Sequence, residues 1–259
     1  MFKTRLLSGI VLVIILIATV GTGGGLLFGF LALISLIGLS ELYKVVDVQN
    51  KILGLTGYLA AVVYYGILYT GQMQYVTFFT IAFLVVLMAV YVFSFPTFKA
   101  EQVMTVFFGV FYVAVMLSYV YQTRMLADGA VAVWLIFLSS WGCDTCAYCA
   151  GMLLGKHKMA PKLSPKKSVE GGIGGIVGAA LLGAIFAFAA NKITGAGVSA
   201  GQYAIICGVG GMISQIGDLA ASAIKRNHDI KDYGKLIPGH GGILDRFDSV
   251  IFTAPIIYY

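Results

Sequence analysis

Charged residues are scarce in this sequence. Only 11% of its 259 residues are Asp, Glu, Lys or Arg, whereas a soluble globular domain carries about 25% charged residues. A chain with so little charge cannot cover a water-facing surface, which argues against a soluble protein. Hydrophobic residues make up 59% of the chain, and the mean hydropathy is +0.93. These values predict an integral membrane protein with several spans.

Cysteine is also scarce, and its spacing is incomplete for a metal cluster. Three of the four cysteines, Cys143, Cys146 and Cys149, follow a C-x-x-C-x-x-C pattern. This pattern is similar to part of an iron–sulfur ligand run, but the fourth ligand and the following proline are missing. We interpret the three as small residues of a membrane helix, with metal or redox chemistry as the alternative. Glycines 171, 174, 175 and 178 form overlapping GxxxG patterns, which favour helix packing.

Two common signatures of nucleotide and nucleic-acid binding are absent or uninformative. The chain lacks GxxxxGK[ST], so it has no P-loop. Its net charge of +6 and pI of about 9.1 would suggest nucleic-acid binding in a soluble protein. In a membrane protein the same residues mark cytoplasmic loops, and we expect no nucleic-acid partner.

Apolar runs long enough to cross a bilayer recur along the chain. Residues 6–40 carry no charge, and "GTGGG" at 21–25 divides them into two helices. We interpret the first as an uncleaved span, not a signal peptide. The further runs are 52–70, 75–95, 103–123, 129–151, 171–191, 201–221 and the short 249–259. The sequence therefore predicts an all-α polytopic membrane bundle of about nine transmembrane helices, the last of them short or incomplete.

The distribution of basic residues sets the expected orientation. With the N-terminus inside, all but two of the 17 Lys and Arg residues fall on cytoplasmic segments, and the exceptions are Arg124 and Lys192. We expect residues 1–128 to hold about five spans and residues 129–259 to form the catalytic region. Its two polar loops, 152–170 and 225–248, then lie on the cytoplasmic face, in a bacterial cytoplasmic membrane.

Two aspartates lie inside apolar runs. At about 1.5 Å per helical residue, Asp144 is roughly 22 Å and Asp218 roughly 26 Å from the outer end of its span. Both therefore approach the cytoplasmic interface at similar depth, where an ionisable residue is by default a functional candidate. Gln215, Asp218, Ser222 and Lys225 lie on one helix face, within about 80° of one another. Such a polar stripe is expected to face a wet interior, not lipid.

The glycine-rich segment "KRNHDIKDYGKLIPGHGGILDRFDS", residues 225–249, combines groups with opposite needs. Lys225, Arg226, Lys231, Lys235 and Arg246 suit phosphate oxygens. Asp218 on the preceding helix, together with Asp232, Asp245 and Asp248, suits a hard divalent cation. Gly239, Gly241 and Gly242 allow close approach of the backbone to a ligand. Together these residues predict a phosphoryl- or nucleotidyl-transfer site. His240 is open to three roles: general base, phosphate donor or structural loop residue.

The stretch "SAIKRNHDIKDYGKLIPGHGGILDRFD", residues 222–248, resembles the signature of the phosphatidate cytidylyltransferases, or CDP-diacylglycerol synthases. "DTCAYCAGMLLGKHKMAPKLSPKKSVEGG", residues 144–172, is similar to a second region of that family. Ser168 stands where the family more often has threonine. The matching signature positions are Ser222, Lys225, Arg226, Lys231, Asp232, Gly234, Pro238, His240, Gly241, Gly242, Asp245, Arg246 and Asp248.

The resemblance implies that CTP and phosphatidic acid give CDP-diacylglycerol and pyrophosphate, with Mg²⁺ as cofactor. It implies that Asp218 and Asp245 bind the metal. We expect Asp144 and Asp248 to complete or orient the site, and Lys225 and Arg226 to act with them. The resemblance also implies a homodimer. The residues expected to contact substrate are Ser164, Lys166, Lys167, Glu170, Ser222, Lys231, Asp232, His240, Gly241, Gly242 and Arg246.

Two other functions stay open at this stage. One is a CTP-dependent lipid-alcohol kinase, which is related in chemistry. The other is an ion-coupled transporter that uses the intramembrane carboxylates as its coupling site. A CDP-alcohol phosphatidyltransferase is disfavoured, because "DGAVAV" at 128–133 has Val133 where that family's D-G-x-x-A-R motif has arginine.

Overall fold

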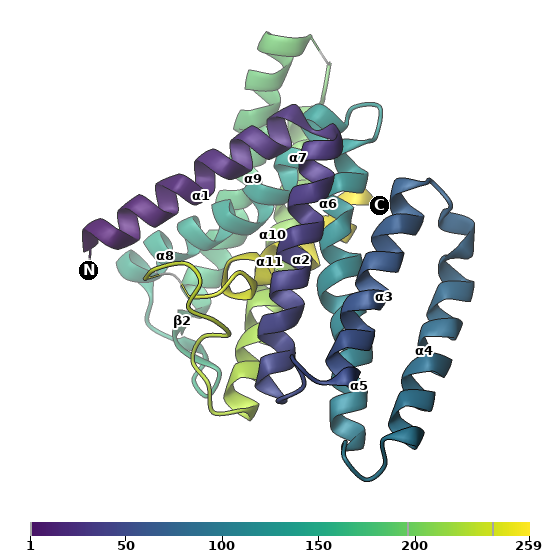
Figure 1. Ribbon diagram of the computed structural model, residues 1–259. Helices are drawn as coiled ribbons and strands as arrows, with labels where there is room; N and C mark the ends of the chain where they lie inside the picture. The colour runs from purple at the N-terminus through teal and green to yellow at the C-terminus, as the bar shows by residue number, and fades with distance from the viewer. Residues whose placement is uncertain (1, 196, 240) are drawn as a thin grey trace. The chain divides into compact units, whose positions relative to one another are not determined.

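The computed structural model describes residues 2–195, 197–239 and 241–259, with side chains from Leu7 onward. Within these ranges the regular secondary structure is helical apart from one small hairpin (Figure 1). The elements are α1 Phe2–Thr22, α2 Gly24–Val45, α3 Ile52–Tyr69, η1 Met73–Tyr75, α4 Val76–Phe93, α5 Ala100–Gly109, η2 Val110–Val115, α6 Met116–Arg124, α7 Gly129–Phe137, η3 Leu138–Gly142, α8 Cys143–Leu154, β1 Lys158–Ala160, β2 Ser164–Ser168, α9 Val169–Thr194, α10 Ala200–Asn227 and α11 Leu244–Tyr258.

Seven helical stretches of the described chain are long and apolar enough to cross a membrane. The apolar part of α1, Leu7–Thr22, is shorter, and α11 has only 15 residues. The predicted all-α polytopic membrane fold is therefore confirmed, and its first and last helices are the shortest candidates. The seven stretches are Gly24–Val45, Ile52–Tyr69, Met73–Phe93, Ala100–Arg124, Gly129–Leu154, Val169–Thr194 and Ala200–Asn227.

The chain forms two compact units that are not contiguous in sequence. Unit 1 comprises residues 1–118 and 232–245, and unit 2 comprises residues 119–231 and 246–259. The polar segment 225–248 is thus shared between the units: its central part packs with the N-terminal helices of unit 1. Two of the three boundaries fall inside helices, α6 and α11, and the third falls in the loop between α10 and α11.

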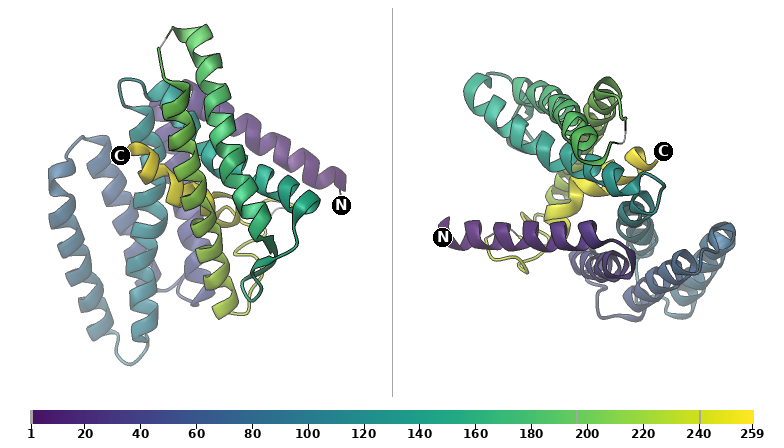
Figure 2. Two further views of the ribbon diagram at one scale, coloured as in Figure 1. Left: turned by 180° about the vertical axis from the view of Figure 1, so that it is seen from behind. Right: turned by 90° about the horizontal axis from the view of Figure 1, so that it is seen from above.

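In unit 1, tyrosines and small residues hold the helices together. Tyr43 of α2 is fully buried and donates a hydrogen bond from its hydroxyl to the Val106 carbonyl of α5 at 3.0 Å. Any side chain at Gly57 or Gly109 would collide with the Tyr43 ring, so these glycines make room for it. The Ser35 and Tyr65 hydroxyls join α2 to α3 at 2.8 Å. Helix α1 runs at a steep angle to α2 (Figures 1 and 2).

In unit 2, α9 packs between α8 and α10 (Figure 2). An added Cβ at Gly174, Gly175 or Gly178 of α9 would meet Ala150, Ala147 or Cys146 of α8. The interpretation of these glycines as a packing face is therefore confirmed, and Cys146 is one of the side chains they accommodate. Ser168 caps the start of α9 by accepting a hydrogen bond from the Gly171 amide at 3.1 Å. Gly195, in the left-handed conformation, ends the helix.

The expected loop 152–170 contains the hairpin formed by β1 and β2. The strands are antiparallel, and Lys158 pairs with Ser168 while Ala160 pairs with Ser164. The carboxylate of Glu170, in the first turn of α9, accepts hydrogen bonds from the Lys156 amide at 3.0 Å and from the His157 amide at 3.2 Å. It also contacts His157 Nδ1 at 2.6 Å. The base of the hairpin is thereby fixed to the start of α9.

Candidate active site

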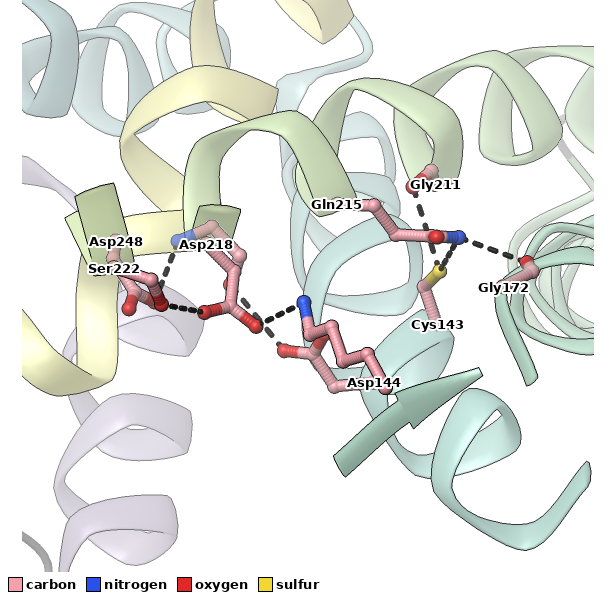
Figure 3. Close-up of polar contacts among 10 residues, drawn as sticks. Cys143, Asp144, Gly172, Gly211, Gln215, Asp218, Ser222 and Asp248 are labelled. Carbon is pink, nitrogen blue, oxygen red and sulfur yellow. Dashed lines mark hydrogen bonds and ion pairs between the residues drawn. The ribbon is translucent and has the colours of Figure 1, made fainter. Parts of the chain in front are cut away.

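Three aspartates from three helices of unit 2 come together. Asp144 lies in the first turn of α8, Asp218 in α10 and Asp248 in the second turn of α11. In Figure 3, Asp218 lies between Asp144 and Asp248. The charge of Asp218 acts on both of the other carboxylates, and Asp144 and Asp248 act on each other. Asp144, Asp218 and Asp248, which the sequence analysis placed at one site, therefore lie together in the structure.

Three cations balance these carboxylates. Lys167 of β2 forms an ion pair with Asp218. Lys225, which is buried one turn beyond Ser222 in α10, acts on Asp248, and Arg246 of α11 acts on Asp144. The cluster of Asp144, Asp218, Asp248, Lys167, Lys225 and Arg246, called the charge cluster below, therefore has no net charge when all six groups are ionised.

Hydroxyl groups orient the carboxylates. Ser222 Oγ donates to Asp218 Oδ1 at 3.4 Å, one helical turn away (Figure 3). Ser249 Oγ donates to Asp144 Oδ2 at 3.5 Å, and its amide donates to Asp248 Oδ1 at 2.8 Å. One serine of α11 thus links two carboxylates that come from different helices. Sequence reasoning missed Ser249, because a serine beside an aspartate carries no signal by itself.

A π-helical segment aims Asp144 into this cluster. η3 occupies Leu138–Gly142, directly before Asp144, and interrupts the regular helical spacing of the span. Such bulges occur often at functional sites because they redirect the side chains that follow. Trp141, within η3, donates from Nε1 to the Arg246 carbonyl at 3.1 Å and packs edge-on against Phe247. η3 therefore connects α8 to the start of α11.

The predicted polar stripe on α10 faces the interior of unit 2. Gln215, Ser222 and Lys225 are buried, and the Asp218 side chain is 27% exposed. Gln215 Nε2 donates to the Gly172 carbonyl at 2.9 Å and to Cys143 Sγ at 3.5 Å, and Cys143 donates to the Gly211 carbonyl at 3.4 Å (Figure 3). Cys143 is thus a buried partner in a polar network that joins α8, α9 and α10.

Arg246 Nε is a buried donor of the charge cluster with no hydrogen-bond partner among the described residues. A buried cationic donor without an acceptor is costly, so native proteins seldom keep one unless a ligand or water satisfies it. The Lys167 ammonium is buried as well, and the Asp218 carboxylate is its partner. Because both groups are cations, an anionic ligand is the kind that fits beside them.

In unit 1, the glycine-rich part of the signature is organised by two carboxylates. Asp245 Oδ2 accepts hydrogen bonds from the amides of Tyr233 at 2.8 Å and Gly242 at 2.9 Å. Gly241 has a φ of +89° and lies against the Asp245 side chain, so a larger residue there would be strained. The expected metal ligand Asp245 therefore has a visible structural role, because it closes the turn that precedes α11.

Glu41 is the second of these carboxylates, and sequence reasoning missed it. It is buried in α2, and its two oxygens accept the amides of Ile243 at 3.0 Å and Leu244 at 2.9 Å. Amides at the start of a helix have no acceptor within the helix itself. Glu41 supplies that acceptor and therefore caps α11 from a distant part of the chain. A signal was available: Glu41 is the first acidic residue of the sequence and lies at the end of an uncharged run.

The remaining predicted residues have other surroundings in the structure. Arg226 is exposed and donates from Nη1 to the Ile230 carbonyl at 3.1 Å. Lys166, Lys231 and Asp232 are exposed, whereas Ser164 is half-buried. Glu170 binds the hairpin base, as described above. His240 lies outside the described residues.

The carboxylates of the charge cluster are suited to bind a hard cation together with phosphate groups of a substrate. No set of three His, Cys, Asp or Glu side chains in the described ranges is arranged to bind a metal by itself. Mg²⁺, however, is commonly held by one or two carboxylates together with substrate phosphates and waters. Carboxylates such as Asp218 and Asp144 provide that kind of ligand, and the Lys167 ammonium shows that Asp218 accommodates a cation. The predicted pairing of Asp218 with Asp245 joins residues of different units and stays a prediction.

Comparison with known proteins gives a consistent result. Residues 3–259 match the sequence model of the cytidylyltransferase family. A phosphatidate cytidylyltransferase of Bacillus subtilis is 32% identical over 266 residues, which cover 99% of this chain and 96% of the relative. That of Staphylococcus saprophyticus is 31% identical over 265 residues, with 98% and 97% covered. That of Staphylococcus aureus strain COL is 30% identical over 262 residues, with the same coverage.

Proposed function

Because this chain belongs to the cytidylyltransferase family, we propose that it transfers the cytidylyl group of CTP to phosphatidic acid. The products are CDP-diacylglycerol, a precursor in phospholipid biosynthesis, and pyrophosphate. The family match and the names of the relatives support this activity over its alternatives, a lipid-alcohol kinase and an ion-coupled transporter.

The charge cluster is the structural observation that carries the proposal. One substrate is a lipid, so the enzyme needs a body of membrane-spanning helices, and the other is a polyanion, so it needs buried cations. Unit 2 has both: long apolar helices, and Lys167, Lys225 and Arg246 held among three carboxylates. A site of this kind accepts phosphate groups because the carboxylates fix the cations before the ligand arrives.

The reaction requires positioning and charge neutralisation more than proton transfer. A phosphate oxygen of phosphatidic acid attacks the α-phosphorus of CTP, a new P–O bond forms, and the bond to the β-phosphate oxygen breaks as pyrophosphate leaves. The attacking oxygen is already anionic, so no strong general base is needed. In this proposal Lys167, Lys225 and Arg246 bind the phosphates and Asp144, Asp218 and Asp248 orient those cations. Bound Mg²⁺ would supply further stabilisation of the phosphate charge.

The orientation in the membrane forms part of the proposal. We place the charge cluster at the cytoplasmic face, where CTP is available, and the N-terminus inside. The positive-inside rule supports this placement, because nearly all Lys and Arg residues fall on one side of the membrane. A homodimer stays a prediction from the family resemblance.

A double-label assay tests the activity. Purified protein in detergent is given phosphatidic acid and CTP labelled either at the α-phosphate or at the γ-phosphate. Transfer of CMP moves only the α-label into lipid, whereas a kinase moves only the γ-label. The α-label should enter lipid only when phosphatidic acid is present. Label in lipid from γ-labelled CTP, or no lipid product at all, would contradict the proposal.

A further inference from the structure

Lys167 has an unusual position for a residue of a surface hairpin. It lies in β2, whose other lysine, Lys166, is exposed. The side chain of Lys167 is only 25% exposed, and its ammonium nitrogen is buried against the Asp218 carboxylate. The hairpin base that carries it is fixed by Glu170, as described above. The ammonium therefore reaches from the hairpin into the interior of unit 2.

A metal ion that binds the Asp218 carboxylate would compete with the Lys167 ammonium for it. Asp218 is the middle carboxylate of the three, and its negative charge acts on both Asp144 and Asp248. Lys167 also acts on Asp144. A cation at Asp218 is therefore attracted by at least two carboxylates, and in the structure that cation is Lys167. A divalent ion that binds Asp218 must displace the ammonium or accept its repulsion.

We propose that Lys167 is a tethered counter-ion that neutralises Asp218 while the site is empty and transfers to the nucleotide phosphates when a divalent cation and CTP bind together. The inference rests on the proposed function and deepens it. It assigns to Lys167 two successive partners, an aspartate in the free enzyme and a phosphate in the complex.

This exchange makes metal and nucleotide binding interdependent. Without nucleotide, a metal ion must separate Lys167 from Asp218 and deprive the buried ammonium of its ion-pair partner. With nucleotide present, the phosphates accept the displaced ammonium, so the metal binds more tightly. By linkage, the metal strengthens nucleotide binding by the same factor. The lysine thus discourages premature metal binding and favours arrival of the metal–nucleotide complex.

Binding of Mn²⁺ to the purified full-length protein tests the exchange without turnover. Free Mn²⁺ is measured by electron paramagnetic resonance, with and without CTP and with no phosphatidic acid. Lys167→Met keeps the length of the side chain but removes the charge. It should bind Mn²⁺ alone about tenfold more tightly than the wild type, and CTP should add less to that affinity. Lys162→Met, on the exposed turn of the same hairpin, should behave like the wild type.

A second measurement uses the unaltered protein, so it does not depend on the variant folding. Lysines are acylated with an amine-reactive reagent, and the rate at Lys167 is followed by mass spectrometry as Mn²⁺ is added. Displacement from Asp218 should raise the rate at Lys167 several-fold, and CTP with Mn²⁺ should lower it again. The rate at Lys162 should stay constant throughout.

The inference is overturned if Lys167→Met binds Mn²⁺ no more tightly than the wild type, or if saturating Mn²⁺ leaves the Lys167 acylation rate unchanged. Either result alone leaves the proposed function intact, provided that the α-label still enters lipid in the wild-type assay. If Lys167→Met binds Mn²⁺ more tightly as expected but the wild type forms no labelled lipid, the proposed reaction is refuted instead.

Discussion

At the scale of single residues, Asp218 carries the largest predicted effect. Asp218→Asn keeps the size of the side chain but removes the charge that attracts a cation. Activity should fall by orders of magnitude, because a bound metal contributes several kcal/mol to the transition state and about 1.4 kcal/mol corresponds to a tenfold change in rate. The measurement is the incorporation of α-label from CTP into lipid at saturating Mg²⁺.

The ion pair with Lys167 adds a prediction for stability. Asp218→Asn leaves the ammonium without its partner, so the melting temperature in detergent should fall. The pair is about a quarter exposed, so the loss should be modest, about 1 kcal/mol. The double variant Asp218→Asn/Lys167→Met should recover the stability but not the activity. Asp229→Asn is the matched control, because Asp229 is an exposed aspartate just beyond the end of α10. Near-normal turnover by Asp218→Asn would remove this residue from the site.

The sequence predicts individual site residues where their position in the chain is energetically costly, as it is for a carboxylate in an apolar span. Asp144 and Asp218 stand out because carboxylates are rare in apolar spans, and simple helix length places them at similar depth. Their proximity is confirmed. The pairing of Lys167 with Asp218 has no such signal, because the contact depends on how the hairpin lies against α10. Neither helical spacing nor hydropathy encodes that arrangement.

At the scale of the elements, the start of α11 depends on Glu41. Glu41→Gln retains one acceptor oxygen but places an amide N–H₂ group against a backbone amide, so one hydrogen bond is lost and one donor is left unsatisfied. We expect a loss of stability of about 1–3 kcal/mol, seen as a lower melting temperature. Activity should fall as well, because α11 carries Asp245 in its first turn and Asp248 about one turn later.

Gly242 provides an independent test of the same contact. A Cβ at Gly242 would collide with both oxygens of Glu41, so Gly242→Ala should lower the melting temperature and the activity as Glu41→Gln does. Gly29→Ala, in the same helix as Glu41, adds a Cβ with nothing within 4 Å and should be neutral. If Gly242→Ala is as stable as Gly29→Ala, the close approach of Glu41 to this segment is wrong.

The helices themselves are predictable from hydropathy, but their interruptions are not. Long apolar runs bounded by polar residues locate the spans, and the glycine spacing of α9 predicts its packing face. The π-helical segments η2 and η3 have no corresponding pattern, because hydropathy does not distinguish a π-helical turn from an α-helical one. The β1–β2 hairpin is also hidden, because its strands are three and five residues long and contain Pro165, which strand interiors usually exclude.

At the scale of the whole molecule, the order of the spans constrains the membrane topology. Seven candidate spans follow one another from α2 to α10, so the segments that join them alternate between the two sides. With all seven crossing, segments 46–51, 94–99, 155–168 and 228–243 fall on one side, and segments 70–72, 125–128 and 195–199 fall on the other. The lysine-rich hairpin lies on the first side, which the positive-inside rule assigns to the cytoplasm. This assignment does not depend on whether α1 crosses.

Labelling of single cysteines tests that assignment. Gly71 and Gly195 lie on the predicted outer segments but have φ values of +68°, where a cysteine would be strained. Gln74 and Lys192 are exposed and close to the same segments, so they are better positions. A membrane-impermeant maleimide added to intact spheroplasts should label Gln74→Cys and Lys192→Cys. It should label Lys162→Cys only after the membrane is permeabilised, and the unaltered chain, with its exposed Cys149, supplies the background.

The position of the N-terminus needs its own probe, because it depends on α1. The described apolar part of α1 has 16 residues, Leu7–Thr22, which is shorter than the roughly 20 that cross a bilayer without strain. If α1 nevertheless crosses, the chain begins in the cytoplasm, and an N-terminal epitope should resist protease in intact spheroplasts. Cleavage of that epitope would place the N-terminus outside while leaving the seven-span assignment unchanged. Labelling of Lys162→Cys from outside has a wider consequence: it would put the hairpin and Lys167 on the side without CTP and refute the cytoplasmic site.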